Sequence, residues 1–141
     1  MSRLRTGNGD DYPEAAHKQL LDAQALLGQQ RADGAAYLSG YVVECALKSC
    51  WQLETGQPRH GHDLNRLALA VGAVAMVAGA KTARYFGVAA SGVPSSAIAA
   101  WRPEMRYQSA TMMQGVAQTW CNVADAVFHE TIARMRLDGV L

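Results

Sequence analysis

The sequence predicts an all-α protein, an up-and-down bundle of four to five antiparallel helices, and three observations support this prediction. Apolar residues recur at spacings of three and four in several long segments of the chain, as they do on one face of a helix. No segment alternates apolar and polar residues over the length of a strand, and no hairpin dipeptide joins two strand-like runs. The links between the helical segments are short, which favours antiparallel packing of consecutive helices.

Length and composition limit the organisation of the chain. With 141 residues, of which 50% are hydrophobic and 18% charged, the chain is long enough to bury one core. We therefore expect a flexible N-terminal segment at 1–10 and a single helical domain at 11–141. The net charge of +1 gives no general attraction to a polyanion, so a surface for nucleic acid would have to be local.

Three features of the sequence indicate a cytoplasmic protein without a membrane segment. The first thirteen residues lack the apolar stretch of a signal peptide. The longest apolar run, 67–80, has fourteen residues, which is too few to span a bilayer. Cys45, Cys50 and Cys121 lie in helical patterns without the spacing of metal ligands, and we expect them to be small buried residues of a reducing compartment.

The first two helices have recognisable starts. Asp11, with Pro13 two positions later, is typical of a helix N-terminus, and apolar positions continue at helical spacing to about Gln30. A short link follows, and Asp33 is placed to cap a second helix. This second helix is expected to continue to about Glu54, before a glycine and a proline end it.

The middle of the chain is predicted to hold a third helix, a loop and a short fourth helix. Asp63 is placed to cap the third helix, which includes the apolar run 67–80. We expect 81–96 to be mostly loop, because this stretch contains two glycines, a proline and a pair of serines. The fourth helix is expected at 96–107, interrupted or restarted by Pro103.

The last helix has the clearest pattern and is expected from about Ser109 to Arg136. A single apolar stripe runs along it at helical spacing, and two arginines near its carboxyl end suit the helix dipole. The stripe is formed by Met113, Val116, Trp120, Val123, Val127, Thr131 and Met135.

A charged pair in the second helix raises the main question about function. Glu44 and Lys48 lie one turn apart, in a stripe that also contains Tyr37, Tyr41 and Trp51. In one interpretation this stripe is the water-facing edge of the helix, where the pair contributes about 0.2–0.5 kcal/mol. In the other, the pair is partly buried among the aromatic residues, and removing one partner costs roughly 3–5 kcal/mol. Composition does not choose between these two interpretations.

Three sequence blocks resemble the HEPN family of helical domains. They are AAYLSGYVVECALKSC at 35–50, GHDLNRLA at 61–68 and WRPEMRY at 101–107, and they occur in the order found in that family. The first block, with its pattern GYxxExxLK, is the most specific of the three. The likeness covers about residues 12–136.

This resemblance implies a bundle of four or five helices that commonly forms a homodimer. Many members bind or cleave RNA, and many are encoded beside a minimal nucleotidyltransferase as toxin and antitoxin. The resemblance therefore implies RNA, a nucleotide or such a nucleotidyltransferase as partner. It also implies a role in a toxin–antitoxin or defence system.

The sequence departs from the family pattern at the catalytic pair. Active ribonucleases of this family carry an arginine followed four to six residues later by a histidine, which suits metal-independent cleavage by the 2′-hydroxyl. Arg106 is the arginine that aligns, but the three histidine positions hold Thr111, Met112 and Met113. A histidine from elsewhere, with His62 as the first choice, would have to supply the base.

We therefore predict a HEPN-type binding module without the standard ribonuclease pair. In this interpretation Glu44 orients Arg106 or Lys48, and the free cation meets a phosphate or a carboxylate of a partner. Aromatic residues of the same site would offer stacking faces to a base. The alternatives are a structural tie between Glu44 and Arg106, or a ribonuclease toxin that uses Arg106 and His62. The predicted binding residues are Tyr41, Glu44, Lys48, Trp101 and Tyr107.

A metal-dependent phosphohydrolase is a further alternative, although we predict no metal site and no cofactor. The His-Asp doublet at 62–63 is found in HD-type phosphohydrolases, and His17 and Asp125 could complete a set of ligands. Such doublets also arise easily by chance, and the aspartate already serves as a predicted helix cap. The preceding residues of the loop, Arg59 and His60, are expected to be solvated.

Overall fold

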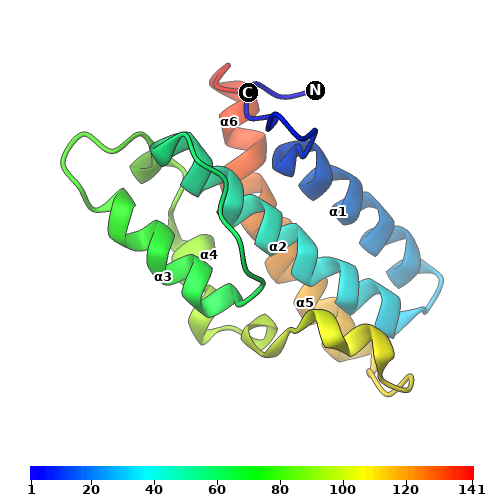
Figure 1. Cartoon of the computed structure of the whole chain (residues 1–141). Helices are drawn as coiled ribbons and strands as arrows, with labels where there is room; N and C mark the ends of the chain where they lie inside the picture. Colours follow the sequence, from blue (N-terminus) through cyan, green and yellow to red (C-terminus); the bar gives the residue numbers. More distant parts are fainter.

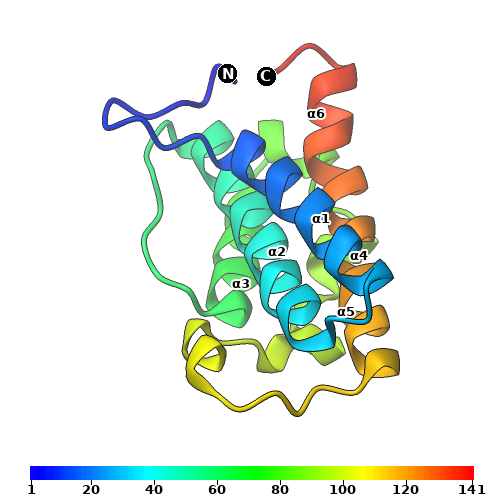
Figure 2. The same ribbon diagram turned by 90° about the vertical axis from the view of Figure 1, so that its right-hand side faces the viewer.

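The computed structural model describes residues 1–141 and confirms the all-α class, since no strand is present. Figure 1 shows α2 between α1 and α3, and Figure 2 shows α5 and α6 on the side opposite the loop that leads to α3. None of the helices combines the length and the hydropathy that a membrane-spanning segment requires. The helices are α1 (Tyr12–Gly28), α2 (Ala32–Thr55), α3 (Leu64–Ala75), α4 (Val88–Ser91), α5 (Gln114–Phe128) and α6 (Arg134–Leu137).

Helices α1 and α2 form an antiparallel pair, and only the first of their two predicted caps is confirmed. The side chain of Asp11 accepts a hydrogen bond from the backbone of Glu14 at 3.3 Å. The predicted cap by Asp33 is wrong, because α2 begins at Ala32 and has no side-chain cap. Instead, Oδ1 of Asp33 accepts hydrogen bonds from the backbone N–H groups of Thr111 and Met112, at 3.0 and 3.2 Å. The carboxylate thereby ties the segment before α5 to the first turn of α2.

Helix α3 runs parallel to α2, which differs from a strict up-and-down order. The link 56–63 is extended and runs back along α2 before α3 begins (Figures 1 and 2). Asp63 then caps α3 as predicted, accepting a hydrogen bond from the backbone of Arg66 at 3.0 Å. After α3 the chain is again at the C-terminal end of α2, where Thr82 donates two hydrogen bonds to Glu54. The direction of the link therefore places loop side chains over the middle of α2.

The segment between α3 and α5 is a series of short helical turns. They are the 3₁₀ turns η1 (Lys81–Arg84), η2 (Val93–Ser95), η3 (Ala97–Ala100) and η4 (Pro103–Tyr107), together with α4. The predicted fourth helix is thus two 3₁₀ turns, separated by the extended residues Trp101 and Arg102. Pro103 explains the break, because a residue before proline is disfavoured in helical conformation.

The C-terminal helical segment begins later than predicted and contains a π-helical turn. It starts at Gln114 and continues through η5 (His129–Ala133) into α6. At its start the predicted stripe is wrong, because Met113 is 72% exposed and Val116 is 38% exposed. From Trp120 onwards the predicted positions are covered by the bundle, with Val123 partly buried and the others buried. The backbone tie to Asp33 holds the segment before Gln114 outside the helix.

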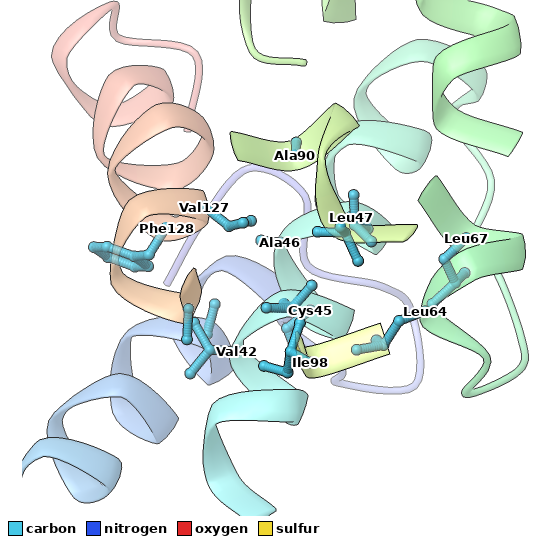
Figure 3. Close-up of a cluster of buried hydrophobic side chains, with 14 of the residues drawn as sticks. Val42, Cys45, Ala46, Leu47, Leu64, Leu67, Ala90, Ile98, Val127 and Phe128 are labelled. Carbon is cyan, nitrogen blue, oxygen red and sulfur yellow. The ribbon is translucent and has the colours of Figure 1, made fainter. Parts of the chain in front are cut away.

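The hydrophobic core is centred on α2. Figure 3 shows side chains of α2 meeting residues of α3, α4, η3 and α5. Full burial of an aliphatic side chain stabilises the folded state by roughly 1.5–3 kcal/mol, so this cluster provides most of the driving force. Because the middle of α2 packs against neighbours on nearly all sides, the polar groups of Glu44 and Lys48 there are enclosed. Its fully buried apolar residues are Ala35, Ala36, Val42, Val43, Ala46, Leu47 and Cys50.

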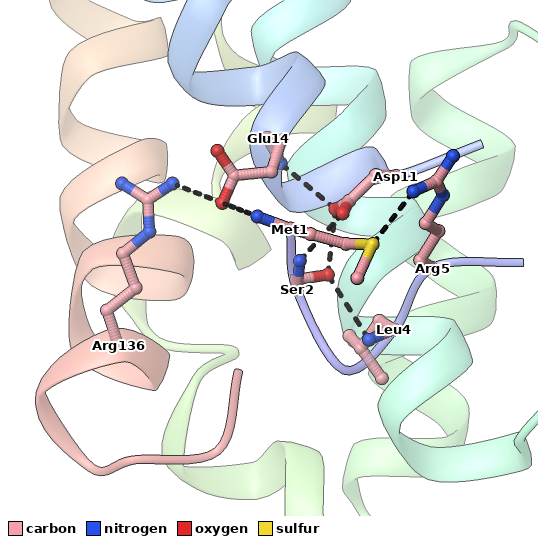
Figure 4. Close-up of polar contacts among 7 residues, drawn as sticks. All are labelled: Met1, Ser2, Leu4, Arg5, Asp11, Glu14 and Arg136. Carbon is pink, nitrogen blue, oxygen red and sulfur yellow. Dashed lines mark hydrogen bonds and ion pairs between the residues drawn. The ribbon is translucent and has the colours of Figure 1, made fainter. Parts of the chain in front are cut away.

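The two ends of the chain lie close together, as Figure 4 shows for the N-terminal contacts. The backbone N–H and the hydroxyl of Ser2 each donate to the carboxylate of Asp11 at 2.7 Å. Burial opposes ionisation of Asp11, but these hydrogen bonds outweigh it and lower the pKa of the carboxyl group. Arg136 donates to Glu14 at 3.1 Å, which joins the end of α6 to the start of α1. The flexibility of residues 1–10 stays a prediction.

Candidate functional site

The pair formed by Glu44 and Lys48 is buried inside the molecule. Nζ of Lys48 donates to Oε1 of Glu44 at 2.7 Å, and the two residues are only 4% and 5% exposed. The interpretation of the α2 stripe as a water-facing edge is therefore wrong for these two positions. Taking both charges out of water is costly unless each is paired and hydrogen-bonded.

His62 occupies the second oxygen of the same carboxylate. Its Nδ1 lies 2.9 Å from Oε2 of Glu44, and because an ionised carboxylate only accepts, Nδ1 carries the proton of this bond. The side chain of His62 is 56% exposed, so the ring is anchored on one edge and open to solvent on the other. Gly61 has φ +100°, a conformation that glycine adopts without strain, and it forms the turn immediately before the histidine.

Lys48 is also enclosed by the N-terminal part of the molecule. Its ammonium group lies 5.5 Å from the centre of the Tyr12 ring, a distance at which a cation is attracted to the face of the ring. Burial raises the pKa of Tyr12, so this hydroxyl stays protonated. Lys48, Glu44 and His62 thus form a chain of polar groups from the interior to the surface.

A groove of about 350 Å³ opens beside the exposed edge of His62. Its lining is almost entirely polar, and two of its residues are arginines. The guanidinium group of Arg59 lies over the ring of Trp51, with its carbon 4.3 Å from the ring centre. The ion pair between Nε of Arg66 and Oδ2 of Asp63 is long, at 3.9 Å. The groove is lined by Arg59, His60, Gly61, His62, Asp63, Arg66 and Leu67.

Arg106 does not contact Glu44, which corrects the expected tie between α2 and the segment before α5. Instead, Arg106 is exposed, and its guanidinium carbon lies 4.8 Å from the centre of the Tyr107 ring. The hydroxyl groups of Tyr107 and Tyr37 raise the pKa of Arg106. Arg106 cannot reach the carboxylate because η4 places it in a separate groove of about 250 Å³, which Tyr37 also lines.

Two tyrosines of α2 lie between the groove of Arg106 and the buried pair of Glu44 and Lys48. The hydroxyl groups of Tyr37 and Tyr41 are 3.1 Å apart, and burial together with this hydrogen bond raises the pKa of Tyr41. The charges of Glu44 and Arg106 also act on Tyr41, in opposite directions. The polar side chains of Tyr37, Tyr41, Glu44 and Lys48 therefore lie in one stripe along α2, which begins at the groove of Arg106 and ends where His62 reaches the carboxylate.

Trp101 and Tyr107 differ in what they could offer to a base. Trp101 is fully buried, and its indole N–H donates to the carbonyl of Tyr37 at 2.9 Å. Its ring packs against Gly40 and lies 4.8 Å from the ring of Tyr41, so it presents no free face for stacking. Tyr107 is 77% exposed and does present one. Of the three aromatic residues predicted to stack on a base, Tyr41, Trp101 and Tyr107, Trp101 has no free face, and stacking by the other two stays a prediction.

The residues of the alternative metal site are not brought together. His17 stacks on Phe128 at 5.5 Å between ring centres, and Asp125 accepts a hydrogen bond from Gln24. Asp63 is engaged as the cap of α3. No group of three or more histidine, cysteine, aspartate or glutamate side chains could hold a metal ion. The geometry therefore gives no support to a phosphohydrolase built on the doublet at 62–63.

Two residues of the site were not identified from the sequence, namely Arg59 and Arg66. Arg59 was expected to be solvated, whereas it is half-buried against Trp51. The available signal was the spacing of these arginines, three positions before and four positions after His62. That spacing gains meaning only once the link 56–63 is known to run along α2.

Comparison with known families agrees with this architecture. The family model described as HEPN domain matches residues 10–133, which is most of the chain. No curated protein and no solved structure matches the chain.

Proposed function

Because the chain belongs to the HEPN domain family, we propose that it is an RNA- or nucleotide-binding module whose binding face follows the polar stripe along α2. RNA-related function is general in this family. The net charge of +1 provides no global attraction to RNA, so binding depends on local groups. The proposed face offers such groups at both of its ends.

One observation carries this proposal, namely the sharing of the buried carboxylate of Glu44 between Lys48 and His62. Replacing a buried ion pair by well-packed apolar residues is often neutral or stabilising. The stability of the bundle alone therefore gives little reason to place this pair beside the core. A site that must hold an imidazole in a fixed orientation at the surface gives a reason.

The groups at the other end of the face suit RNA. Arg106 is exposed and has no carboxylate partner, so its guanidinium can meet a phosphate group, and the ring of Tyr107 beside it, which is 77% exposed, provides a stacking surface for a base. These two residues lie outside the core, so their removal tests binding without threatening the fold. Base stacking and phosphate pairing at one position are typical of single-stranded RNA recognition.

The binding experiment uses fluorescence anisotropy with a labelled single-stranded oligoribonucleotide and the full chain. The double variant Arg106→Ala/Tyr107→Ala is expected to bind at least about tenfold more weakly, given the usual worth of stacking on one base. Lys18→Ala serves as control, because Lys18 is exposed on α1 and its loss removes a positive charge elsewhere. An equal loss of affinity in the double variant and in Lys18→Ala would refute the proposal.

A second candidate is a metal-independent ribonuclease that uses His62 as base and Arg106 as cation. The observation in its favour is the hydrogen bond that Nδ1 of His62 donates to Glu44, which orients the imidazole as in many proton-transfer sites. RNA cleavage in the presence of chelator, abolished by His62→Ala and by Arg106→Ala, would establish it. If RNA stays intact after incubation with the wild-type protein, the ribonuclease is refuted and the binding module remains the proposed function.

Partners and location form the remaining part of the proposal. We include a homodimer, because HEPN domains often form dimers, and a cognate minimal nucleotidyltransferase in a toxin–antitoxin or defence system. Leu69 in the middle of α3, and Met76 and Val77 just after its end, are each more than half exposed and offer apolar side chains to a protein partner. Light scattering after size exclusion, with and without a coexpressed nucleotidyltransferase, measures both assemblies.

The three buried, unpaired cysteines accord with the proposed cytoplasmic location.

A further inference from the structure

Arg59 is held in place without an acidic partner. Its guanidinium group is half-buried and lies over the ring of Trp51, which fixes its position at the edge of the groove beside His62. No hydrogen bond or ion pair to a carboxylate involves this side chain, whereas the carboxylates nearest in sequence, Glu54 and Asp63, are engaged with Thr82 and with the start of α3. A positioned guanidinium that lacks an anion in the folded chain is available for an anion from outside.

The groove as a whole carries an excess of positive charge. Two guanidinium groups, from Arg59 and Arg66, face a single carboxylate, that of Asp63. Two imidazoles, from His60 and His62, add further hydrogen-bond donors. Glu44 does not offset this charge, because its carboxylate is already paired with Lys48. The N-terminus of α3 is already capped by the side chain of Asp63.

The lining favours a phosphate group over a base. Leu67 is the only hydrophobic residue of the groove, and Arg59 covers the ring of Trp51, so no aromatic face is free for stacking. Arginine forks and imidazole N–H groups match the oxygens of a phosphate, and a terminal phosphate offers more of these oxygens and more charge than a diester. The volume of about 350 Å³ leaves room for such a group and its hydration.

We propose that this groove, formed by Arg59, His62 and Arg66, binds the terminal phosphate monoester of a nucleotide or of an RNA end. The inference rests on the proposed function and deepens it, because it assigns the terminal phosphate of the ligand to this groove. In an RNA, Tyr107 at the other end of the face would meet a base further along the chain. Glu44 fixes the ring of His62 through Nδ1. Nε2 of the same ring is then left for the ligand and, when Nε2 carries a proton, can donate it in a hydrogen bond to the phosphate.

The test compares one oligoribonucleotide in three forms, with a 5′-phosphate, with a 3′-phosphate and with two hydroxyl ends. One phosphorylated form is expected to bind at least about tenfold more tightly than the hydroxyl form, as charge-assisted bidentate contacts predict. This advantage should fall below about twofold in Arg59→Ala and in Arg66→Ala, while Arg5→Ala, a matched loss of charge outside the groove, should keep it. Arg66 is so exposed, at 87% of its side chain, that its replacement leaves the fold intact.

A parallel titration uses inorganic phosphate alone. Side-chain NMR signals of Arg59 and His62 are expected to shift and saturate in the wild-type protein, and the His62 shift should weaken in Arg59→Ala. Equal affinity for all three RNA forms, with no saturable shift, would overturn the phosphate site while leaving RNA binding itself intact. Saturable phosphate binding without any affinity for RNA would support the site and refute the RNA-binding proposal.

Discussion

Nδ1 of His62 lies 2.9 Å from Oε2 of Glu44, and this contact joins an exposed loop to the middle of the central helix. The same carboxylate holds Lys48 through its other oxygen. A buried acid therefore neutralises a buried base and at the same time orients a surface imidazole. The arrangement makes the loop position and the interior charge balance depend on one side chain.

The first prediction concerns this shared carboxylate. Glu44→Ala is expected to lower the free energy of unfolding by roughly 3–5 kcal/mol, because it leaves the ammonium of Lys48 buried without a partner. Lys48→Met should have an effect of similar sign, and the double variant Glu44→Met/Lys48→Met should recover most of the loss. Urea denaturation at neutral pH measures all three. Single variants that each cost less than about 1 kcal/mol, the range of a surface pair, would show that the pair is not buried in solution.

The second prediction concerns the contact between Gly40 and Trp101. A Cβ atom at Gly40 would lie 2.1–2.2 Å from atoms of the indole, so Gly40→Ala should displace a fully buried ring and destabilise the fold by about 1–3 kcal/mol or more. Gly115→Ala in α5 is the matched control, because nothing lies within 4 Å of its added methyl group. That control should be neutral or stabilising by up to about 1 kcal/mol. If thermal unfolding showed the same change in stability for both variants, the close packing of Trp101 against Gly40 would be contradicted.

The third prediction concerns the pH dependence of the bond between Thr82 and Glu54. The hydroxyl of Thr82 donates to Glu54 at 2.6 Å and its backbone N–H at 2.8 Å, and these bonds lower the pKa of Glu54. A carboxylate with a lowered pKa in the folded state stabilises the fold above its unfolded pKa, and the contribution is lost as the pH falls through the folded pKa. Thr82→Val should therefore cost roughly 1–2 kcal/mol at pH 7 and much less at a pH well below about 4, because the folded pKa of Glu54 lies below its unfolded value. Denaturation curves at both pH values measure this, and an unchanged difference at low pH would refute it.

The fourth prediction concerns the reactivity of the cysteines. Burial raises the pKa of Cys45 to about 12 and that of Cys50 to about 12, and burial also raises the pKa of Cys121. Since the thiolate is the reactive form, all three should resist a thiol reagent at pH 8 in the native protein and react together in urea. Rapid modification of one cysteine in the folded protein would show that the core around it opens locally.

Much of the fold is predictable from the sequence because its signals are local. Asp63 caps α3 as its position before an apolar run indicates, and the spacing of Asp11 and Pro13 marks the start of α1. Asp33 has the same local signal but a different role, since its oxygen binds backbone groups near Thr111. Local pattern does not reveal a contact that depends on how two distant segments meet.

The candidate site was only partly predictable for the same reason. The helical spacing of Glu44 and Lys48 places them together, but composition left open whether the pair is buried, as the structure shows it to be. The positions of His62 beside Glu44 and of Arg59 over Trp51 depend on the direction in which the link 56–63 runs. No local sequence signal in that link indicates this direction. Arg106 was expected at the carboxylate from family resemblance, but η4 places it beside Tyr107 instead.

The π-helical turn at His129–Ala133 sets the alignment of the last part of the chain. Such a turn adds a residue to an α-helix, and each added residue rotates the rest of the helix by about 100°. Glu130, within the turn, accepts three backbone hydrogen bonds near α4, and Met135 beyond it reaches the core. Deleting one residue of this turn would therefore rotate the terminal helix out of phase with the bundle. Chain length at this point is a constraint as strict as side-chain identity.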